Sequence, residues 1–200
     1  LNVGVPIALQ ETTVQISFLV VNSVINQMGL MPSAGYGIAQ KIVSFIMLVP
    51  SSVMQSVSAF VAQNIGAGKY DRAKQTLRYA MMIAIGFGLV VSILIQFIAA
   101  PVVGLFTADA AVILLGAQYI RGYIWDCIFA GVHFSFSGYF CACGKSGISF
   151  LHNLIAILCV RIPGVYLTSK IFPHTLFPMG LATAIGSLLS VIICIIAYRW

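Results

Sequence analysis

Charged side chains are scarce in this sequence, and acidic ones are the scarcest. Only 7% of its 200 residues are charged, with ten Lys+Arg against four Asp+Glu, whereas a soluble domain carries about 25% charged residues. Hydrophobic residues make up 60% of the chain, and its mean hydropathy is +1.05. So few charges cannot cover a water-facing surface, because most helix faces would meet the solvent as apolar patches. The sequence therefore indicates that lipid surrounds the protein.

The marks of several other protein classes are missing as well. The five cysteines lie in or at the ends of apolar runs, without the paired loop spacing of a disulfide framework, and we interpret them as reduced packing residues. The net charge of +6 comes without a basic helix face or an aromatic-interleaved patch, so nucleic acid is not an expected partner. The run Gly66-Ala67-Gly68-Lys69 lacks the flanking Gly and Ser or Thr of a phosphate-binding loop, and we expect a tight turn there.

No motif for catalysis is found. A six-span serine protease of the rhomboid type needs a Gly-x-Ser-Gly turn, but Ser137 and Gly138 follow Phe136. Cys141 and Cys143 lack a second pair of ligands at the spacing of a zinc site. We therefore expect no enzyme, no catalytic residues, no cofactor and no firm metal site.

Apolar runs separated by Gly- and Pro-containing breaks dominate the chain. One crossing of the hydrocarbon core, which is about 30 Å thick, takes about 20 helical residues. The expected spans are the six runs at residues 3–28, 36–65, 77–106, 111–140, 148–171 and 176–198. They predict an all-α polytopic membrane protein in which residues 1–200 form a single six-helix bundle. The chain opens on an apolar stretch without an initiator Met, which is typical of a fragment.

Basic residues indicate the orientation in the membrane, because short cytoplasmic loops are enriched in Lys and Arg. The odd-numbered loops hold only Lys170. Six of the ten basic residues lie in or beside the even-numbered loops or at the C-terminal end: Lys69, Arg72, Lys74, Arg78, Lys145 and Arg199. We therefore expect a multi-pass protein of the cell membrane with both ends of the chain in the cytoplasm.

Small residues recur at four-residue spacing in the third and sixth expected spans. The pairs are Ala84 with Gly88, and Ala182 with Gly186 and then Ser190. This spacing lets helix backbones approach closely. We interpret both stripes as packing faces.

Polar side chains inside the first expected span share one helical face. At 100° per residue, Glu11, Gln15 and Asn22 fall on the same side. An ionisable group within a span costs about 2.5–3.5 kcal/mol on insertion scales, so this stripe points away from lipid. Two interpretations stay open, namely hydrogen bonding to a neighbouring helix and the wall of a cavity.

Further ionisable residues interrupt the fourth and fifth expected spans. Asp126 lies near the middle of the fourth, with His133 on the same face, and Arg161 precedes Pro163 in the fifth. Asp126 is a candidate for binding a coupling ion or a substrate, and the alternative is a structural ion pair with Arg161 or Arg121. For His133 a satisfied buried imidazole is favoured over a proton relay. Pro163 predicts a bend, and bent helices at mid-membrane are common at transporter sites.

Several motifs resemble, in order and spacing, the second half of a multidrug and toxin extrusion (MATE) exporter. The most specific is Gln63-Asn64-Ile65-Gly66-Ala67-Gly68-Lys69. Residues 3–10, 34–42, 119–121, 138–140 with 143–145, and 160–163 match as well, so the likeness spans the chain. It implies a twelve-span protein of two related six-helix bundles, with the N-terminal half as the partner of the present chain.

The resemblance also implies an activity. Members of this family export cationic amphipathic drugs across the bilayer by alternating access, in exchange for Na⁺ or H⁺. Carried onto this chain, the likeness makes a set of polar residues candidates for binding substrate or ion, with Na⁺ near Asp126 as the candidate metal. The set is Glu11, Asp126, Gln10, Gln15, Asn22, Arg161 and His133.

Two other functions compete with drug export. A flippase for lipid-linked precursors, from the same superfamily, would need several cations in its cavity for an anionic headgroup, and only Arg121 and Arg161 are available inside the spans. A membrane scaffold without transport activity would pair its intramembrane charges structurally.

Overall fold

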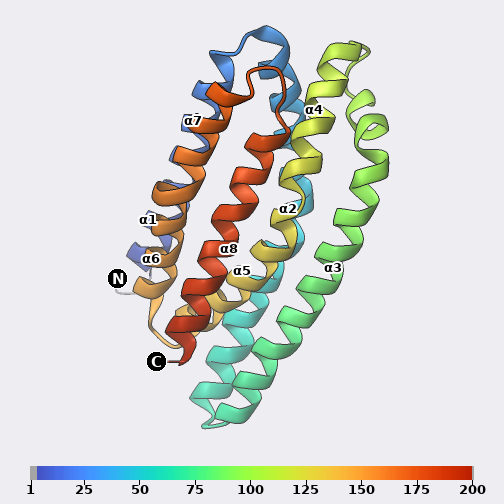
Figure 1. Ribbon diagram of the computed structural model, residues 1–200. Helices are drawn as coiled ribbons and strands as arrows, with labels where there is room; N and C mark the ends of the chain where they lie inside the picture. Colours follow the sequence, from blue (N-terminus) through green and yellow to red (C-terminus); the bar gives the residue numbers. More distant parts are fainter. Residues whose placement is uncertain (1–3, 200) are drawn as a thin grey trace.

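Helices account for nearly all of residues 4–199, the part of the chain that the computed structural model describes, and no strand occurs in this range (Figure 1). Residue 3, where the first expected span begins, lies outside the described residues. In chain order the elements are α1 (Gly4–Asn26), α2 (Leu30–Gly66), α3 (Tyr70–Gly104), α4 (Ala110–Tyr123), α5 (Asp126–Ala142), α6 (Ser146–Ala156), a π-helical turn η1 (Ile157–Arg161), α7 (Ile162–Ile171) and α8 (Phe177–Arg199).

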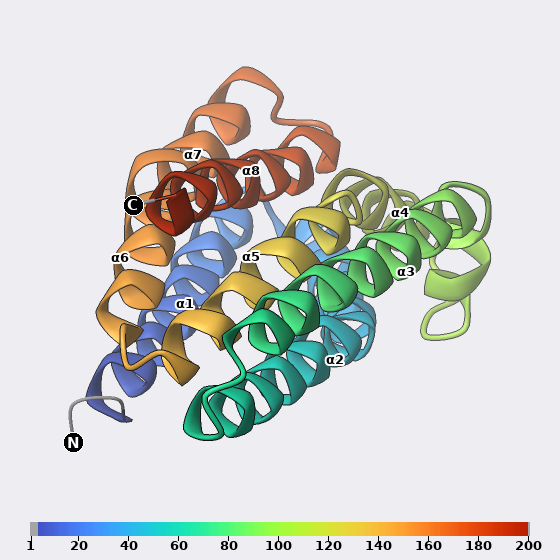
Figure 2. The same cartoon turned by 90° about the horizontal axis from the view of Figure 1, so that it is seen from below.

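These elements form a bundle of six segments, because α4 is followed directly by α5, and α6 continues through η1 into α7. Seen from one end, α5 lies between α8 and α3, with α1, α6 and α7 gathered on one side and α2 on the other (Figure 2). Four segments, α2, α3, residues 146–171 and α8, are long and apolar enough to cross a membrane by length and composition. The predicted all-α polytopic bundle is confirmed.

Several predicted boundaries are wrong. α2 begins at Leu30 rather than at residue 36, because Pro32 sits in the first turn, where its missing N–H costs nothing. The fourth expected span is broken at Ile124 and Trp125 into α4 and α5, although neither residue is a helix breaker. The fifth contains the π-helical turn η1 directly before Pro163, where the sequence predicts only a bend.

The turns after α2 and α5 share one geometry. Gly68 and Gly144 adopt the left-handed conformation, with φ of +70° and +73°, which suits glycine. The N–H of Lys69 donates to the Asn64 carbonyl at 2.8 Å, and that of Lys145 donates to the Phe140 carbonyl at 2.8 Å. Both are helix-ending motifs in which glycine stops the helix, so the tight turn predicted at Gly68 is confirmed.

Both stripes of small residues pack against neighbouring helices. In α3, Gly88 faces Ile128 of α5 so closely that an added Cβ would lie 2.9 Å from the Ile128 Cα, and Ala84 faces Gly131. In α8, Ala182 meets Gly164 of α7. The predicted packing faces are confirmed, and they hold α3 and α8 against the centre of the bundle.

The closest helix approach lies between α4 and α8 and gives a test of the packing. A Cβ added at Gly180 would collide with the Tyr119 carbonyl oxygen and the Tyr123 nitrogen, so Gly180→Ala would push the two helices apart at a cost of about 1–3 kcal/mol. We expect a lower Tm for the purified protein, measured by thermal unfolding in detergent. The matched control is Gly86→Ala, where no atom lies within 4 Å and where the change should stabilise α3 by about 0.5–1 kcal/mol. Equal Tm values for the two variants would contradict the close α4–α8 contact.

Candidate functional site

Two buried ionisable side chains lie where helices are interrupted. Asp126 is the first residue of α5, directly after the break, and Arg161 is the last residue of η1. Their side chains are only 4% and 9% exposed. Irregular backbone at membrane depth is typical of transporter sites, and π-helical turns frequently mark functional positions.

The π-helical turn has a local cause and a clear effect. Pro163 lacks an N–H, and its ring clashes with the carbonyl of the residue four positions earlier in a regular helix. The widened turn at Ile157–Arg161 accommodates this and places Arg161 among the buried residues of the bundle. Gly186 of α8 makes room there, since a Cβ added to it would lie 3.6 Å from the Arg161 Cβ. The bend expected at Pro163 therefore takes the form of a bulge that buries a charge.

Asp126 and Arg161 attract one another across the interior, but neither is fully satisfied. The hydroxyls of Tyr123 and Ser187 lie beside the Asp126 carboxyl, and Arg161 acts on it electrostatically. Even so, Oδ1 of Asp126 and both Nε and Nη2 of Arg161 are buried without a hydrogen-bond partner. The guanidinium of Arg161 lies 4.1 Å from the centre of the Phe18 ring in α1, a cation–π contact. The pair therefore keeps hydrogen-bonding capacity for a third group.

A small chamber adjoins Arg161. Its volume is about 20 Å³, and its polar walls include Asn153, Arg161, Thr183 and Ser187. A hollow of this size holds roughly one water molecule. The Thr183 hydroxyl is another buried group without a partner. We call this space the Arg161 chamber.

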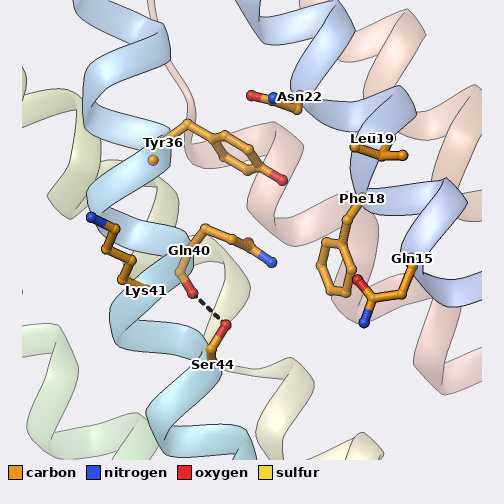
Figure 3. A pocket seen from close by; sticks show the side chains of 9 residues that line it. Gln15, Phe18, Leu19, Asn22, Tyr36, Gln40, Lys41 and Ser44 are labelled. Atoms are coloured by element: carbon orange, nitrogen blue, oxygen red, sulfur yellow. Dashed lines mark hydrogen bonds between the residues drawn. The ribbon is translucent and has the colours of Figure 1, made fainter. Parts of the chain in front are cut away.

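An open hollow of about 380 Å³, the α1–α2 hollow, lies between the first two helices. Tyr36 and Gln40 of α2 point towards α1, whereas the Lys41 amino group turns away from it (Figure 3). The α1 wall includes Gln15 and Asn22, which the sequence placed on one face. Phe18 lines the same hollow and also covers Arg161, so its ring separates the hollow from the buried charges.

A second open hollow of about 550 Å³, the Glu11 hollow, lies among α1, α2, α5 and α6. Glu11 is exposed in it, whereas Gln10 is buried and accepts a hydrogen bond of 3.0 Å from the Ser149 hydroxyl. Asn153 lines both this hollow and the Arg161 chamber. The side chain of Asn153 is therefore a wall that the Glu11 hollow and the Arg161 chamber share.

His133 belongs to a separate polar contact in the core. Its ring centre lies 5.7 Å from that of His152, and its Nδ1 is buried without a partner. His152 Nε2 lies 3.0 Å from the Ser137 hydroxyl, and its Nδ1 lies 3.1 Å from the Ser190 hydroxyl. Ser190 also lines the Arg161 chamber, so the histidines are connected to the chamber through one hydroxyl.

The structure thus divides the residues singled out from the sequence. Asp126 and Arg161 come together, while Glu11 and Gln10 lie at one hollow, and Gln15 and Asn22 at the other. The other possible partner, Arg121, is not among the groups that act on Asp126; its own Nε is buried without a hydrogen-bond partner. Sequence reasoning missed a further group of residues around these sites. They are Phe18, Tyr36, Tyr123, His152, Asn153, Thr183 and Ser187.

One signal could have found part of that group. His152 and Asn153 are adjacent polar residues in an otherwise apolar run. The tyrosines and hydroxyls carry no such signal, because they occur at ordinary frequency in apolar helices. Within residues 4–199, no group of three or more His, Cys, Asp or Glu side chains could hold a metal ion.

Comparisons with known proteins agree with this architecture. The MatE family matches residues 6–167. The chain is 27% identical over 169 residues to the probable multidrug resistance protein YoeA of Bacillus subtilis, covering 84% of this chain and 36% of that protein. It is 28% identical over 191 residues to the multidrug export protein MepA of Staphylococcus aureus, covering 94% of this chain and 40% of MepA.

The fold matches a solved transporter of similar design. The MATE transporter VcmN of Vibrio cholerae superposes with a TM-score of 0.92 at 15% identity, covering 99% of this chain and 45% of that one. The chain therefore spans less than half the length of these relatives, which are transporters and not enzymes. From the family match over most of its length, this multi-pass membrane chain belongs to the MatE family, the MATE exporters that its motifs resemble.

Proposed function

We propose that this chain forms the C-terminal half of a secondary transporter that exports small amphipathic cations in exchange for H⁺ or Na⁺. The observation that supports this best is the buried Asp126 carboxyl, which keeps an unpartnered oxygen next to Ser187 of the Arg161 chamber, a chamber that shares the Asn153 wall with the open Glu11 hollow. The names of YoeA and MepA, which refer to multidrug resistance and multidrug export, support the class of substrate. Since the relatives are more than twice as long, a second bundle of the same protein is the proposed partner.

Arg161 gives the proposed ion exchange its energetic basis. When Asp126 is ionised, it attracts Arg161. When it binds a proton or a metal cation, that attraction is lost and Arg161 must find other contacts. A ligand shifts a conformational equilibrium by its difference in affinity for the two states. Shifting the ratio of two conformations from 1:99 to 99:1 takes a difference in binding free energy of about 5.5 kcal/mol. The loss of a charge partner in a buried pair costs about 3–5 kcal/mol, which is of similar size.

Of the two ions, the proton fits the surroundings of Asp126 better. A sodium ion needs several oxygen ligands around it, and the neighbouring oxygens are those of Asp126, Tyr123 and Ser187. It would also lie next to the Arg161 guanidinium. A proton needs neither additional ligands nor additional space, so we infer that H⁺ is the coupling ion, with Na⁺ as the alternative.

The two hollows suit a lipophilic cation. Aromatic rings face both of them, Phe18 and Tyr36 in the α1–α2 hollow and Phe134 in the Glu11 hollow, and ring faces attract cations. Glu11 supplies a negative charge, while Lys41 turns away (Figure 3). The sequence made both carboxyls candidates for binding either substrate or ion. We now assign the ion to Asp126 and the drug's positive charge to Glu11.

A flippase for anionic headgroups finds less support. Arg161 interacts electrostatically with Asp126, and neither Arg161 nor Arg121 lines either hollow. Neither hollow therefore gathers the positive charge that such a headgroup needs. The basic residues at the end of the bundle with the α2–α3 and α5–α6 turns support a cytoplasmic location for both ends of the chain in the cell membrane.

The first test of this function is Asp126→Asn in the full-length transporter. Removing the exchangeable charge should reduce proton-driven dye efflux from loaded vesicles at least about tenfold, the effect of about 1.4 kcal/mol. The matched control is Asp109→Asn. Asp109 is exposed and caps α4 by accepting from the N–H groups of Ala111 and Val112, and Asn caps equally well. Efflux by Asp126→Asn at the rate of the control would exclude Asp126 from coupling.

The ion is identified in the same vesicles. If H⁺ is coupled, collapsing the pH gradient with a protonophore should abolish efflux, whereas removing Na⁺ should leave it unchanged. Efflux that persists without a pH gradient and stops without Na⁺ would identify Na⁺, and not H⁺, as the coupling ion. Efflux that depends on neither the pH gradient nor the Na⁺ gradient would exclude secondary transport.

Glu11 should act on the substrate and not on the ion. We expect Glu11→Gln to raise the KM for a monovalent cationic dye by about tenfold, with kcat nearly unchanged, because one charge contact that is open to water is worth about 1 kcal/mol or slightly more. A neutral dye of similar shape serves as the control, and its KM should not change. A fall in kcat for both dyes would instead assign Glu11 to coupling.

Asn153 should control the passage between the Glu11 hollow and the Arg161 chamber. Asn153→Leu replaces the polar wall shared by the two spaces with an apolar one of similar size. We expect a slower efflux rate, with unchanged equilibrium binding of the dye to the purified transporter. An unchanged rate would show that the ion reaches Asp126 by another route, past Phe18.

A further inference from the structure

A third hollow lies outside the transport site, at the end of the bundle that carries the α2–α3 and α5–α6 turns. Its volume is about 420 Å³, and its wall contains two lysines and two tyrosines: Lys74, Lys145, Tyr139 and Tyr198. They come from the start of α3, the end of α5 with its following turn, and the end of α8. The residues of the other hollows do not line it.

The hollow is built from well-packed parts. The rings of Tyr139 and Tyr198 contact one another edge to face, with centres 5.5 Å apart, and Phe136 supports Tyr198 at 5.6 Å. Lys145 has a fixed backbone, because its N–H donates to the Phe140 carbonyl at 2.8 Å and it immediately precedes α6. Two ammonium groups and two phenol groups are thus presented by elements whose positions the fold determines.

Charge at this end of the bundle is strongly positive. Six basic residues gather here, and Asp71 is the one acidic residue of this loop region. No acidic side chain lines the hollow itself. An anion is therefore the ligand that this hollow attracts.

We propose that this hollow binds the phosphate group of an anionic phospholipid. Lysine and tyrosine side chains concentrate where a helix bundle crosses the headgroup region, and anionic lipids are drawn to such basic sites. The Lys74 and Lys145 ammonium groups and the Tyr hydroxyls donate to the phosphate oxygens. The apolar part of the wall, which includes Phe140 and Ala197, takes up the glycerol and the first acyl carbons. Inorganic phosphate has no apolar part that could pack against this surface.

The site is tested on the purified full-length transporter by native mass spectrometry, with titration of phosphatidylglycerol, phosphatidylcholine and inorganic phosphate. Because a basic residue near an anionic membrane contributes about 1 kcal/mol, we expect Lys74→Gln and Lys145→Gln each to weaken phosphatidylglycerol binding by about fivefold, and the double variant by about 25-fold. Tyr198→Phe, which keeps the ring and removes the hydroxyl, should give a smaller loss. Phosphatidylcholine, which carries no net charge, should bind weakly to every variant.

Two matched controls separate the hollow from general electrostatic attraction. Lys69→Gln removes a charge at the same end but outside the hollow, and Lys170→Gln removes one in the last turn of α7, at the opposite end of the bundle. Both should bind phosphatidylglycerol within about twofold of the unmodified protein. Equal losses in Lys69→Gln and Lys74→Gln, or full binding by the double variant, would overturn the proposal. Inorganic phosphate that binds as tightly as phosphatidylglycerol, with the same lysine dependence, would overturn the assignment to a lipid. Because dye efflux is not the readout, failure here leaves the transport proposal untouched.

Discussion

The mutual dependence of Asp126 and Arg161 constrains the interior of this bundle more than any other interaction. Each charge alone would cost about 2.5–3.5 kcal/mol inside a membrane span, and the attraction between the two offsets part of that cost. The backbone departs from regular helix at both residues. The break before α5 places Asp126 at a helix N-terminus, where the positive end of the helix dipole favours a carboxylate. The bulge before Pro163 turns Arg161 into the same region.

The helices around this pair differ in how firmly they are held. α3 and α8 press small residues against α5, α4 and α7, and such close backbone contacts leave little room for independent movement. α1 is different. The hydroxyls of Thr12, Thr13 and Ser17 donate to carbonyls of α1 itself and so do not tie it to its neighbours. Its contacts to the centre include the Gln10–Ser149 hydrogen bond and Phe18 over Arg161. Few polar side-chain contacts therefore tie α1, which carries Phe18, to the rest of the bundle.

The sequence predicts the environment of this site, namely the membrane and the packing faces, better than it predicts the geometry of the site itself. Scarcity of charge determines the membrane class, and the four-residue spacing of Ala84 and Gly88 predicts a packing face, because both depend on composition or on one helix alone. Asp126 and Arg161 stand out for the same reason, as charges in apolar runs. The local sequence does not predict the break at Ile124 and Trp125, since both residues are compatible with an apolar helix. Tertiary packing overrides this preference.

Positions between helices are harder still to predict. Helical periodicity correctly places Glu11, Gln15 and Asn22 on one face, but it gives no information about which helices that face meets. The structure distributes this face over two separate hollows. In the same way, periodicity groups His133 with Asp126, whereas the fold places its ring against His152 of α6. Contacts over long sequence separations decide both outcomes, and no single segment contains the information.

The presence of Arg161 has a consequence for turnover that a lone carboxyl would not have. A transporter that exchanges ions must return through a state in which its carboxyl has released the ion, and a bare carboxylate in a low dielectric is costly. Arg161 is a positive charge that the protein carries itself, so Asp126 has a partner in that state as well. In the proposed exchange, the coupling ion therefore competes with an internal cation and not with an empty site, which lowers the affinity for the ion and favours its release. Phe18 stabilises the other half of the cycle, because its ring face offers the guanidinium an alternative contact when the ion occupies Asp126.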